Sequence, residues 1–379
     1  MSLRRHRRGW RLALSLVVVS LALVLAIGPF TRTARTIPAS QSASAATATA
    51  AAASAATPTP TPTYPANALP LRGGIHVKNL YNLAIVSQTF AADGWFWLEW
   101  DQPLEDVIRA ANIPRDRLVE FDNQVEMWDS LIEAETPEPV RSADGRYSQM
   151  FRFSAIFYIP SIDLHNSPFD TIVLPIVLET RPDLFSLSQR AVRLEFNQRQ
   201  ESLVGAYGDV AGYELQGAAL RPAINSYQWL GSEQNAAYSQ LVLSITYGTD
   251  SLAAFLKWIL PLLIVMIIVL LAPSLEGSLN DIRLAIPSTA LLTLVFLQLT
   301  YRAELPATPY PTFLDQLYAY SYLVAVGVFL LFVWSSNLLE EAPEARREAV
   351  RRQTNRVDSL FQMGALVGGV VWGLLAWFL

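Results

Sequence analysis

Five strongly apolar segments stand out from the alternation of hydrophobic and polar positions along this chain. The first, Leu12 to Ile27, follows a cluster of arginines near the N-terminus. The other four lie in the C-terminal third, and each approaches the roughly 20 residues that a helix needs to cross a bilayer. They predict a transmembrane domain over 251–379, with helices at about 252–272, 284–300, 313–334 and 360–379.

The segment between Gly73 and Asp250 follows a period of two, which is typical of strands. In "WFWLEW", Phe96, Leu98 and Trp100 face one way, whereas the residues between them face the other. "FRFSAIFYI" and "LVLSITY" alternate in the same manner, and Gly, Pro, Asn and Asp separate the strands. We predict an all-β sandwich over 71–250, with a short helix near residues 104–111.

The N-terminus has the charged-then-apolar layout of an export signal. Residues 1–30 are therefore predicted to be a signal peptide, or a signal anchor that is never cleaved, because no clean A-x-A site follows. A twin-arginine signal is a further alternative, since two arginine pairs precede the apolar run. Residues 31–70 are rich in Ala, Ser, Thr and Pro and predict a disordered linker.

Arginine distribution predicts the orientation of the helices. Between the third and fourth apolar segments, the loop at 336–358 contains five arginines, at positions 346, 347, 351, 352 and 356. The positive-inside rule makes this loop cytoplasmic. Counting back places the sandwich on the exported side, in agreement with the N-terminal signal. We expect a multi-pass protein of a bacterial inner membrane with a periplasmic N-terminal domain.

Composition narrows the possible functions. Charged residues make up 16% of the chain, below the roughly 25% of soluble domains, and the net charge of −5 offers no basic surface for nucleic acid. The absence of cysteine excludes disulfides, zinc thiolates and cysteine nucleophiles. No recognised catalytic motif accompanies the three histidines. We therefore expect no enzyme activity, no cofactor and no bound metal.

A stripe of positions marks the second apolar segment. Spacings of 4, 3, 4, 3 and 4 place six residues on one face of a helix: Ala285, Thr289, Leu292, Phe296, Leu299 and Ala303. Such a stripe is either an ordinary packing face or, where copies surround an axis, the lining of a pore whose apolar rings gate by dewetting. Pro287 is expected to interrupt this helix.

Three stretches contain motifs in a fixed order. "SQTFAADGWFWLEWDQPL" contains the W-x-D-x-x-L-like Trp100, Asp101 and Leu104, and "YIPSIDLHNSPFDTIVLPIVLE" contains a P-F-D core ending at Asp170. "RLAIPSTALLTLVFLQLTYRAELPATPYPTFLDQ" contains the striped segment and the loop that follows it. By this order and spacing, the chain resembles the pentameric ligand-gated ion channels, the Cys-loop receptor superfamily, over roughly 73–379. The second stretch lacks the two cysteines of the animal receptors, and the third is similar to the pore helix and its outer loop.

The resemblance implies a homopentamer in membrane lipid, opened by a small molecule that binds between adjacent sandwiches. An aromatic cage with an acid suits an ammonium group, so an amine is one candidate ligand. The matching positions are Trp95, Ile132, Glu133, Phe185, Tyr227, Trp229 and Tyr238. The alternative is that these aromatic residues belong to the core or to a subunit interface.

The resemblance also implies how binding is coupled to the pore. Asp170 in the signature loop and Arg302 and Pro306 in the outer pore loop are the expected coupling residues. The family usually pairs the aspartate with an arginine before the first span, but here Tyr247 to Asp250 contains none, so Arg302 is the candidate substitute.

Charge near the cytoplasmic mouth predicts ion selectivity. Five copies of Asp281 would form an acidic ring that attracts cations, whereas Arg283 is expected to point away from the axis, as in the family. The alternative function is a membrane-anchored ligand-binding sensor with the same fold that does not conduct ions. The missing junction arginine and Pro287 favour that alternative.

Overall fold

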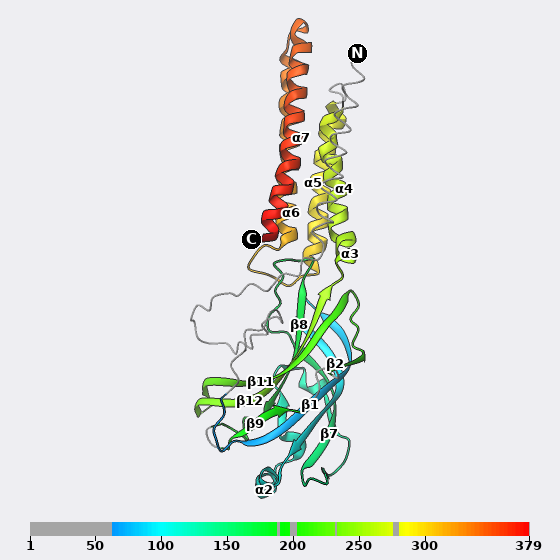
Figure 1. Cartoon of the computed structure of the whole chain (residues 1–379). Coiled ribbons are helices and arrows are strands. Elements are labelled where there is room, and N and C mark those ends of the chain that lie inside the picture. The colour runs from blue at the N-terminus through cyan, green and yellow to red at the C-terminus, as the bar shows by residue number, and fades with distance from the viewer. Residues whose placement is uncertain (1–62, 188–189, 198–202, 232, 276–279, 379) are drawn as a thin grey trace. The chain divides into compact units, whose positions relative to one another are not determined.

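The computed structural model describes residues 63–187, 190–197, 203–231, 233–275 and 280–378 (Figure 1). The chain divides into two compact units. Of the described residues, those within 63–163 and 171–249 form the sandwich unit, and those of the loop 164–170 and within 250–378 form the membrane unit. The predicted signal segment (1–30) and most of the predicted linker (31–70) lie outside the described residues.

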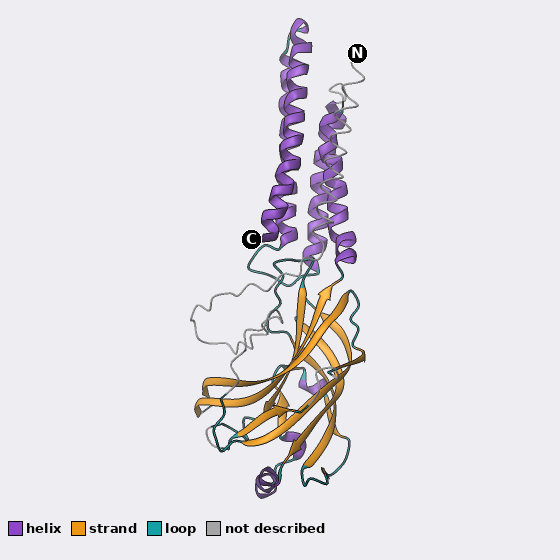
Figure 2. Cartoon of the chain, in the orientation of Figure 1, coloured by secondary structure: helices purple, strands orange, loops and turns teal. Residues whose placement is uncertain are grey.

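Two sheets form the sandwich unit (Figure 2). The larger has the order β10-β1-β2-β7-β4, with β5 and β6 also on β7 and β9 on β1; the smaller has the order β11-β12-β8-β3. Their bounds are β1 (Leu69–Ala84), β2 (Thr89–Trp100), β3 (Val119–Phe121), β4 (Gln124–Val125), β5 (Leu131–Ala134), β6 (Val140–Arg141), β7 (Tyr147–Tyr158), β8 (Thr171–Thr180), β9 (Val192–Phe196), β10 (Val204–Tyr207), β11 (Tyr213–Leu230) and β12 (Glu233–Thr249). The predicted β-sandwich architecture is confirmed at this level.

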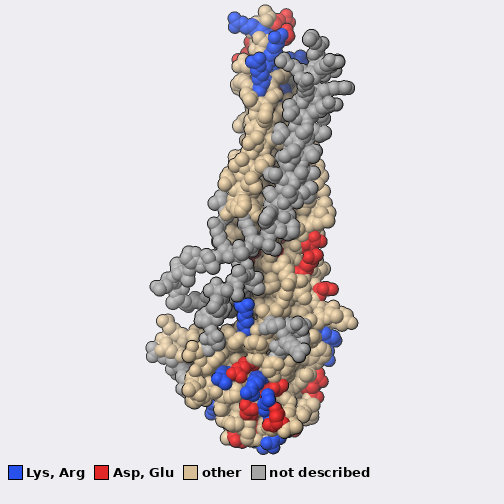
Figure 3. All heavy atoms as spheres, viewed as in Figure 1, with Lys and Arg blue, Asp and Glu red and all other residues tan. Residues whose placement is uncertain are grey.

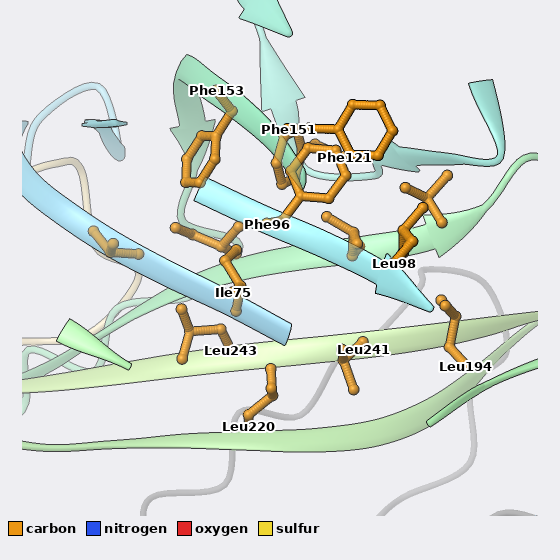
Figure 4. Packing of buried hydrophobic residues seen from close by; sticks show 14 of the residues in the cluster. Ile75, Phe96, Leu98, Phe121, Phe151, Phe153, Leu194, Leu220, Leu241 and Leu243 are labelled. Carbon is orange, nitrogen blue, oxygen red and sulfur yellow. The ribbon is translucent and has the colours of Figure 1, made fainter. Parts of the chain in front are cut away.

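The alternation expected from the sequence determines which side chains form the core. Phe96, Leu98 and Trp100 are buried, whereas Trp95 and Trp97 on the other face of β2 are half-buried. Aromatic rings of β2 and β7 pack in the core of the sandwich unit (Figure 4), where Phe96 stacks on Phe151 with ring centroids 4.9 Å apart. Burial of these large apolar surfaces provides the main drive for folding of this unit.

A polar network fixes the corner where β2 ends. Helix α2 (Gln102–Ala110) begins directly after Asp101. Within it, Glu105 is fully buried, accepting a hydrogen bond from Trp100 Nε1 at 2.8 Å and pairing with Arg109 at 2.6 Å and Arg115 at 2.9 Å. Burial alone would raise the pKa of Glu105, but these donors outweigh it and lower that pKa. The segment from Trp100 to Leu104 therefore lies at a corner that is held by buried hydrogen bonds and ion pairs.

Four helices among the described residues are long and apolar enough to cross a membrane. The first combines α3 (Ser251–Ala254), a π-helical turn (Phe255–Ile259), α4 (Leu260–Leu271) and a final turn (Ala272–Ser274); the others are α5 (Asn280–Ala303), α6 (Phe313–Glu341) and α7 (Arg347–Phe378). These helices indicate a multi-pass membrane protein.

Two helices extend beyond the apolar segments that predicted them. Helix α6 continues to Glu341 and α7 begins at Arg347, so the predicted loop at 336–358 is mostly helical. Apolar windows miss these turns because they are rich in Arg, Glu and Gln, which are good helix formers. An exposed pair four residues apart, Glu348–Arg352 at 2.6 Å, supports the added turns. Basic side chains gather at this end of the helices (Figure 3).

The expectation that Pro287 interrupts the second helix is wrong. Helix α5 is continuous from Asn280 to Ala303, with Pro287 buried inside it. Because proline has no N–H, the hydrogen bond to the Arg283 carbonyl cannot form. Membrane helices tolerate such a proline where neighbouring helices surround it.

Candidate functional site

The predicted stripe on α5 is exposed along its whole length in a single chain. Leu292, Phe296 and Leu299 are 58%, 59% and 61% exposed, and Ala285, Thr289 and Ala303 are also exposed. The opposite face is buried within the membrane unit; it comprises Arg283, Pro287, Ala290, Leu294 and Tyr301. Packing inside one chain therefore leaves the stripe facing outward.

Polar side chains distinguish this face from the exposed faces of the other spans. Over residues 260–271, 319–334 and 360–375, all the exposed residues are apolar or glycine, as expected of surfaces that contact lipid. Over the corresponding residues 285–300 of α5, the exposed residues include Ser288, Thr289 and Thr300. Polar groups in a span are costly in lipid and usually face protein or water. The stripe is therefore chemically suited to an aqueous or intersubunit surface.

Two charges in the first turns of α5 lie on opposite sides of the helix. Asp281 is exposed and forms no ion pair among the described residues. Arg283 is 3% exposed and donates from Nη2 to Asp358 Oδ2 on α7 at 2.7 Å. Residues two apart on a helix do not share a face, so burying the arginine leaves the aspartate on the outward side.

Charges at the other end of α5 are paired. Arg302 Nη2 lies 2.7 Å from Asp315 Oδ2 on α6, and Arg302 Nη1 donates to Thr308 Oγ1 at 3.2 Å. Lys257 Nζ lies 2.7 Å from Glu304 Oε2. The acid added by Glu304 is thus balanced by Lys257. The candidate coupling residue Arg302 thus forms an ion pair with Asp315.

The loop between β7 and β8 belongs to the membrane unit. Residues 164–170, which contain the P-F-D core, contact the connection between α5 and α6 and the first turn of α6. The His165 ring stacks on Tyr310 with centroids 3.7 Å apart, and the backbone N–H groups of Phe313 and Leu314 donate to the carbonyls of His165 and Ser167 at 2.7 and 3.2 Å.

Aromatic contacts and a helix cap hold the same region. The Phe169 ring lies 5.9 Å from Trp377 near the end of α7, measured between centroids. At the start of α6, Thr312 and Asp315 form a capping box, in which each side chain accepts from the backbone N–H of the other. Asp170 is buried at the end of this loop, and Pro306 is half-buried in the α5–α6 connection. Loop 164–170 thus packs against the connection that follows α5 and against the start of α6.

Candidate ligand residues on the larger sheet lie in one row. Trp95 pairs in register with His76 on one side and Arg152 on the other, and Arg152 pairs with Glu133 on β5. Lys78 Nζ lies 5.7 Å from the Trp95 ring centroid. A lysine of the same chain thus already lies over this tryptophan ring. Ile132 alternates with Glu133 and packs against the core.

The remaining candidates divide by exposure. Trp229 near the tip of the β11–β12 hairpin is 63% exposed, and Tyr227 is half-buried with its ring 6.0 Å from Tyr238, measured between centroids. The side chains of Phe185 and Tyr238 are each 1% exposed, so they are buried within a single chain. Trp229 and Tyr227 are therefore the candidates best placed to meet a ligand.

Sequence reasoning missed a buried polar cluster beside these tyrosines. Glu179 on β8 is 1% exposed, and its Oε2 accepts from Gln240 at 2.7 Å and from Asn225 at 3.0 Å. The same Gln240 amide donates to Asp122 at 3.1 Å. Burial first and the charge of Asp122 second raise the pKa of Glu179 to about 7. A glutamate within an otherwise apolar strand, "IVLPIVLE", was the available sequence signal.

Asp358 was also missed. Its signal was a lone acid at the edge of the last apolar segment, together with an arginine at the edge of the second one.

No protein-family model matches the sequence, and no curated protein matches it at a significant level.

Proposed function

We propose that the protein is a homopentameric ligand-gated ion channel of a bacterial inner membrane, with the sandwich in the periplasm. The observation that carries this proposal is the outward-facing stripe of α5, because it places exposed hydroxyls among large apolar side chains within the span, with an exposed acid at one end. Five such helices around an axis would stack polar rings with apolar ones, as gated pores do. The resemblance of three ordered stretches to pentameric channels supports the number five.

A small ligand, with an amine as the leading candidate, is proposed to bind between adjacent sandwiches. Trp229 supplies an exposed aromatic face, and Tyr227 lies on the same hairpin. An ammonium group is attracted to such rings. Signalling then runs through loop 164–170, whose contacts with Tyr310 and the first turn of α6 link it to the pore helix.

Cations are the proposed permeant ions. Arg302, Glu304 and Arg283 each have a partner of opposite charge, whereas Asp281 is exposed and forms no ion pair among the described residues. Five copies of Asp281 would leave a net negative ring at one mouth of the pore. Reversal potentials in a sodium chloride gradient test this, since a value near the chloride potential would contradict it.

Assembly is tested by the mass of the purified protein in mild detergent. The proposal requires five copies, because the stripe encloses a pore only when identical helices face one axis. A stable monomer or dimer would remove the pore.

The alternative is a membrane-anchored sensor that binds the ligand without conducting ions. One observation favours it: the junction before the first span contains no basic residue, and its Asp250 instead caps α3 by accepting from Leu252 N at 2.9 Å and Ala253 N at 3.3 Å. Pro287 no longer supports this alternative, because α5 is continuous. Sodium flux into liposomes that contain the purified protein separates the two functions.

A further inference from the structure

The ion pair between α5 and α7 is unusual in its burial. The side chains of Arg283 and Asp358 are each 4% exposed, and their Nη2 and Oδ2 atoms are 2.7 Å apart. The guanidinium also lies 4.3 Å from the centroid of the Phe332 ring on α6. Among the described residues, Asp358 is the acid that pairs with this arginine.

The pair is joined by one hydrogen bond rather than by two. Arg283 Nε and Asp358 Oδ1 are both buried and have no hydrogen-bond partner among the described residues. A carboxylate and a guanidinium usually fit together as a two-bond fork. Neutralising the arginine therefore depends on Asp358 itself rather than on a wider network of acids.

The position of Arg283 on α5 makes the neutralisation of its charge relevant to ion permeation. Arg283 lies two residues from Asp281, in the same end of α5. Each Arg283 charge is cancelled within its own chain, so Asp281 determines the net charge of that end of the pore helix. Without Asp358, a positive charge in a poorly solvated site would oppose every Asp281, and the field of a buried charge is weakly screened.

We propose that Asp358 is a positioning residue for ion selectivity: from α7, outside the pore-lining helix, it holds and cancels Arg283 so that Asp281 acts alone on permeating ions. This inference rests on the proposed channel function. It assigns a selectivity role to a residue of α7, whose exposed side chains over 360–375 are suited to lipid.

The test compares reversal potentials in a sodium chloride gradient for the wild type, Asp358→Asn and the double variant Arg283→Gln/Asp358→Asn. The single variant should move the reversal potential toward the chloride potential, and the double variant should restore the wild-type value because no unpaired charge remains. Asp358→Glu should retain cation preference. Glu348→Gln is the matched control, since it removes the acid of an exposed pair on the same helix.

Each outcome decides the matter. An Asp358→Asn channel that assembles and conducts with an unchanged reversal potential overturns the inference alone, as does a double variant shifted as far as the single one. A wild-type protein that assembles but is silent overturns the proposed function, and the inference with it. If Asp358→Asn does not assemble alone, co-assembly with excess wild type gives rings with few unpaired arginines, and a graded shift is then expected. Rings that incorporate the variant without any shift overturn the inference.

Discussion

His165 and Tyr310 stack face to face, with ring centroids 3.7 Å apart and planes 7° from parallel. The first residue follows strand β7 and the second lies between helices α5 and α6, so the stack ties a loop of the sandwich sequence to the helices. The Tyr310 hydroxyl also accepts from the Leu164 backbone N–H at 3.1 Å. One side chain thus holds the loop by two separable contacts.

Substitutions at Tyr310 should separate these contacts. Tyr310→Phe removes one hydrogen bond and should lower the free energy of unfolding by about 1 kcal/mol. Tyr310→Ala also removes the ring and should cost about 2 to 3 kcal/mol. Thermal unfolding in detergent measures both changes, with Tyr207→Phe at an exposed tyrosine as the control. Equal stability of the two Tyr310 variants would contradict a stabilising role for the stack.

Leu292→Thr should open the proposed gate more easily. The hydroxyl would wet a ring of the constriction and favour the conducting state, giving larger resting currents or greater sensitivity to agonist. Leu330→Thr on α6 is a matched control, because Leu330 is 59% exposed and Leu292 is 58% exposed. If Leu292→Thr conducts with unchanged gating, the gate lies at Phe296 or Leu299 instead.

Stability of the sandwich should fall as pH rises through the titration range of Glu179. Its pKa is raised from 4.5 to about 7 in the folded protein. The folded state therefore retains the proton that the unfolded chain releases, so the stabilisation is complete below pH 4.5 and lost above about pH 7. The shift corresponds to about 3 kcal/mol. Arg181 does not offset this burial, because its nearby acid partners are Glu120 and Asp183.

Replacing Glu179 with glutamine isolates this effect from the titration of Asp122 and Glu120, whose pKa values burial also raises. Glu179→Gln should be close to the wild type in thermal stability at pH 4 and exceed it at pH 8. Asp116→Asn, at an exposed acid, should give no such divergence. Parallel pH profiles for Glu179→Gln and the wild type would show that Glu179 is ionised in the folded protein.

Asp281→Asn should reduce cation preference. The exposed carboxylate forms no ion pair among the described residues, so its removal takes away the uncompensated charge of the proposed mouth. Reversal potentials in a salt gradient give the measurement, and Glu304→Gln, just beyond the opposite end of α5, provides a comparison. An unchanged cation preference in Asp281→Asn would refute the role given to this residue.

Local periodicity explains why much of this structure was predictable from the sequence. The alternation around Phe96 and the spacing from Ala285 to Ala303 depend on neighbours in the chain, so they predicted the buried face of β2 and the outward face of α5. Apolar windows likewise located the four spans, although not the charged turns that extend α6 and α7.

Contacts between distant residues explain most of what the sequence did not predict. The pairing of Arg283 with Asp358 and the hydrogen bonds of Glu179 depend on which elements become neighbours in the fold. Residue type alone also gave wrong candidates for the ligand site, because a ligand can contact only exposed side chains. Phe185 and Tyr238 are aromatic residues at positions matching a ligand site, yet both are buried within one chain.

Planar-bilayer recording of the purified wild-type protein beside Leu292→Thr tests the central claim most directly. If α5 lines a gated pore, Leu292→Thr shows discrete cation-selective openings without added ligand, while the wild type opens rarely in the same membranes. Leu330→Thr should behave as the wild type does. Properly assembled wild-type and Leu292→Thr proteins that both pass no current would contradict the channel and leave the non-conducting sensor.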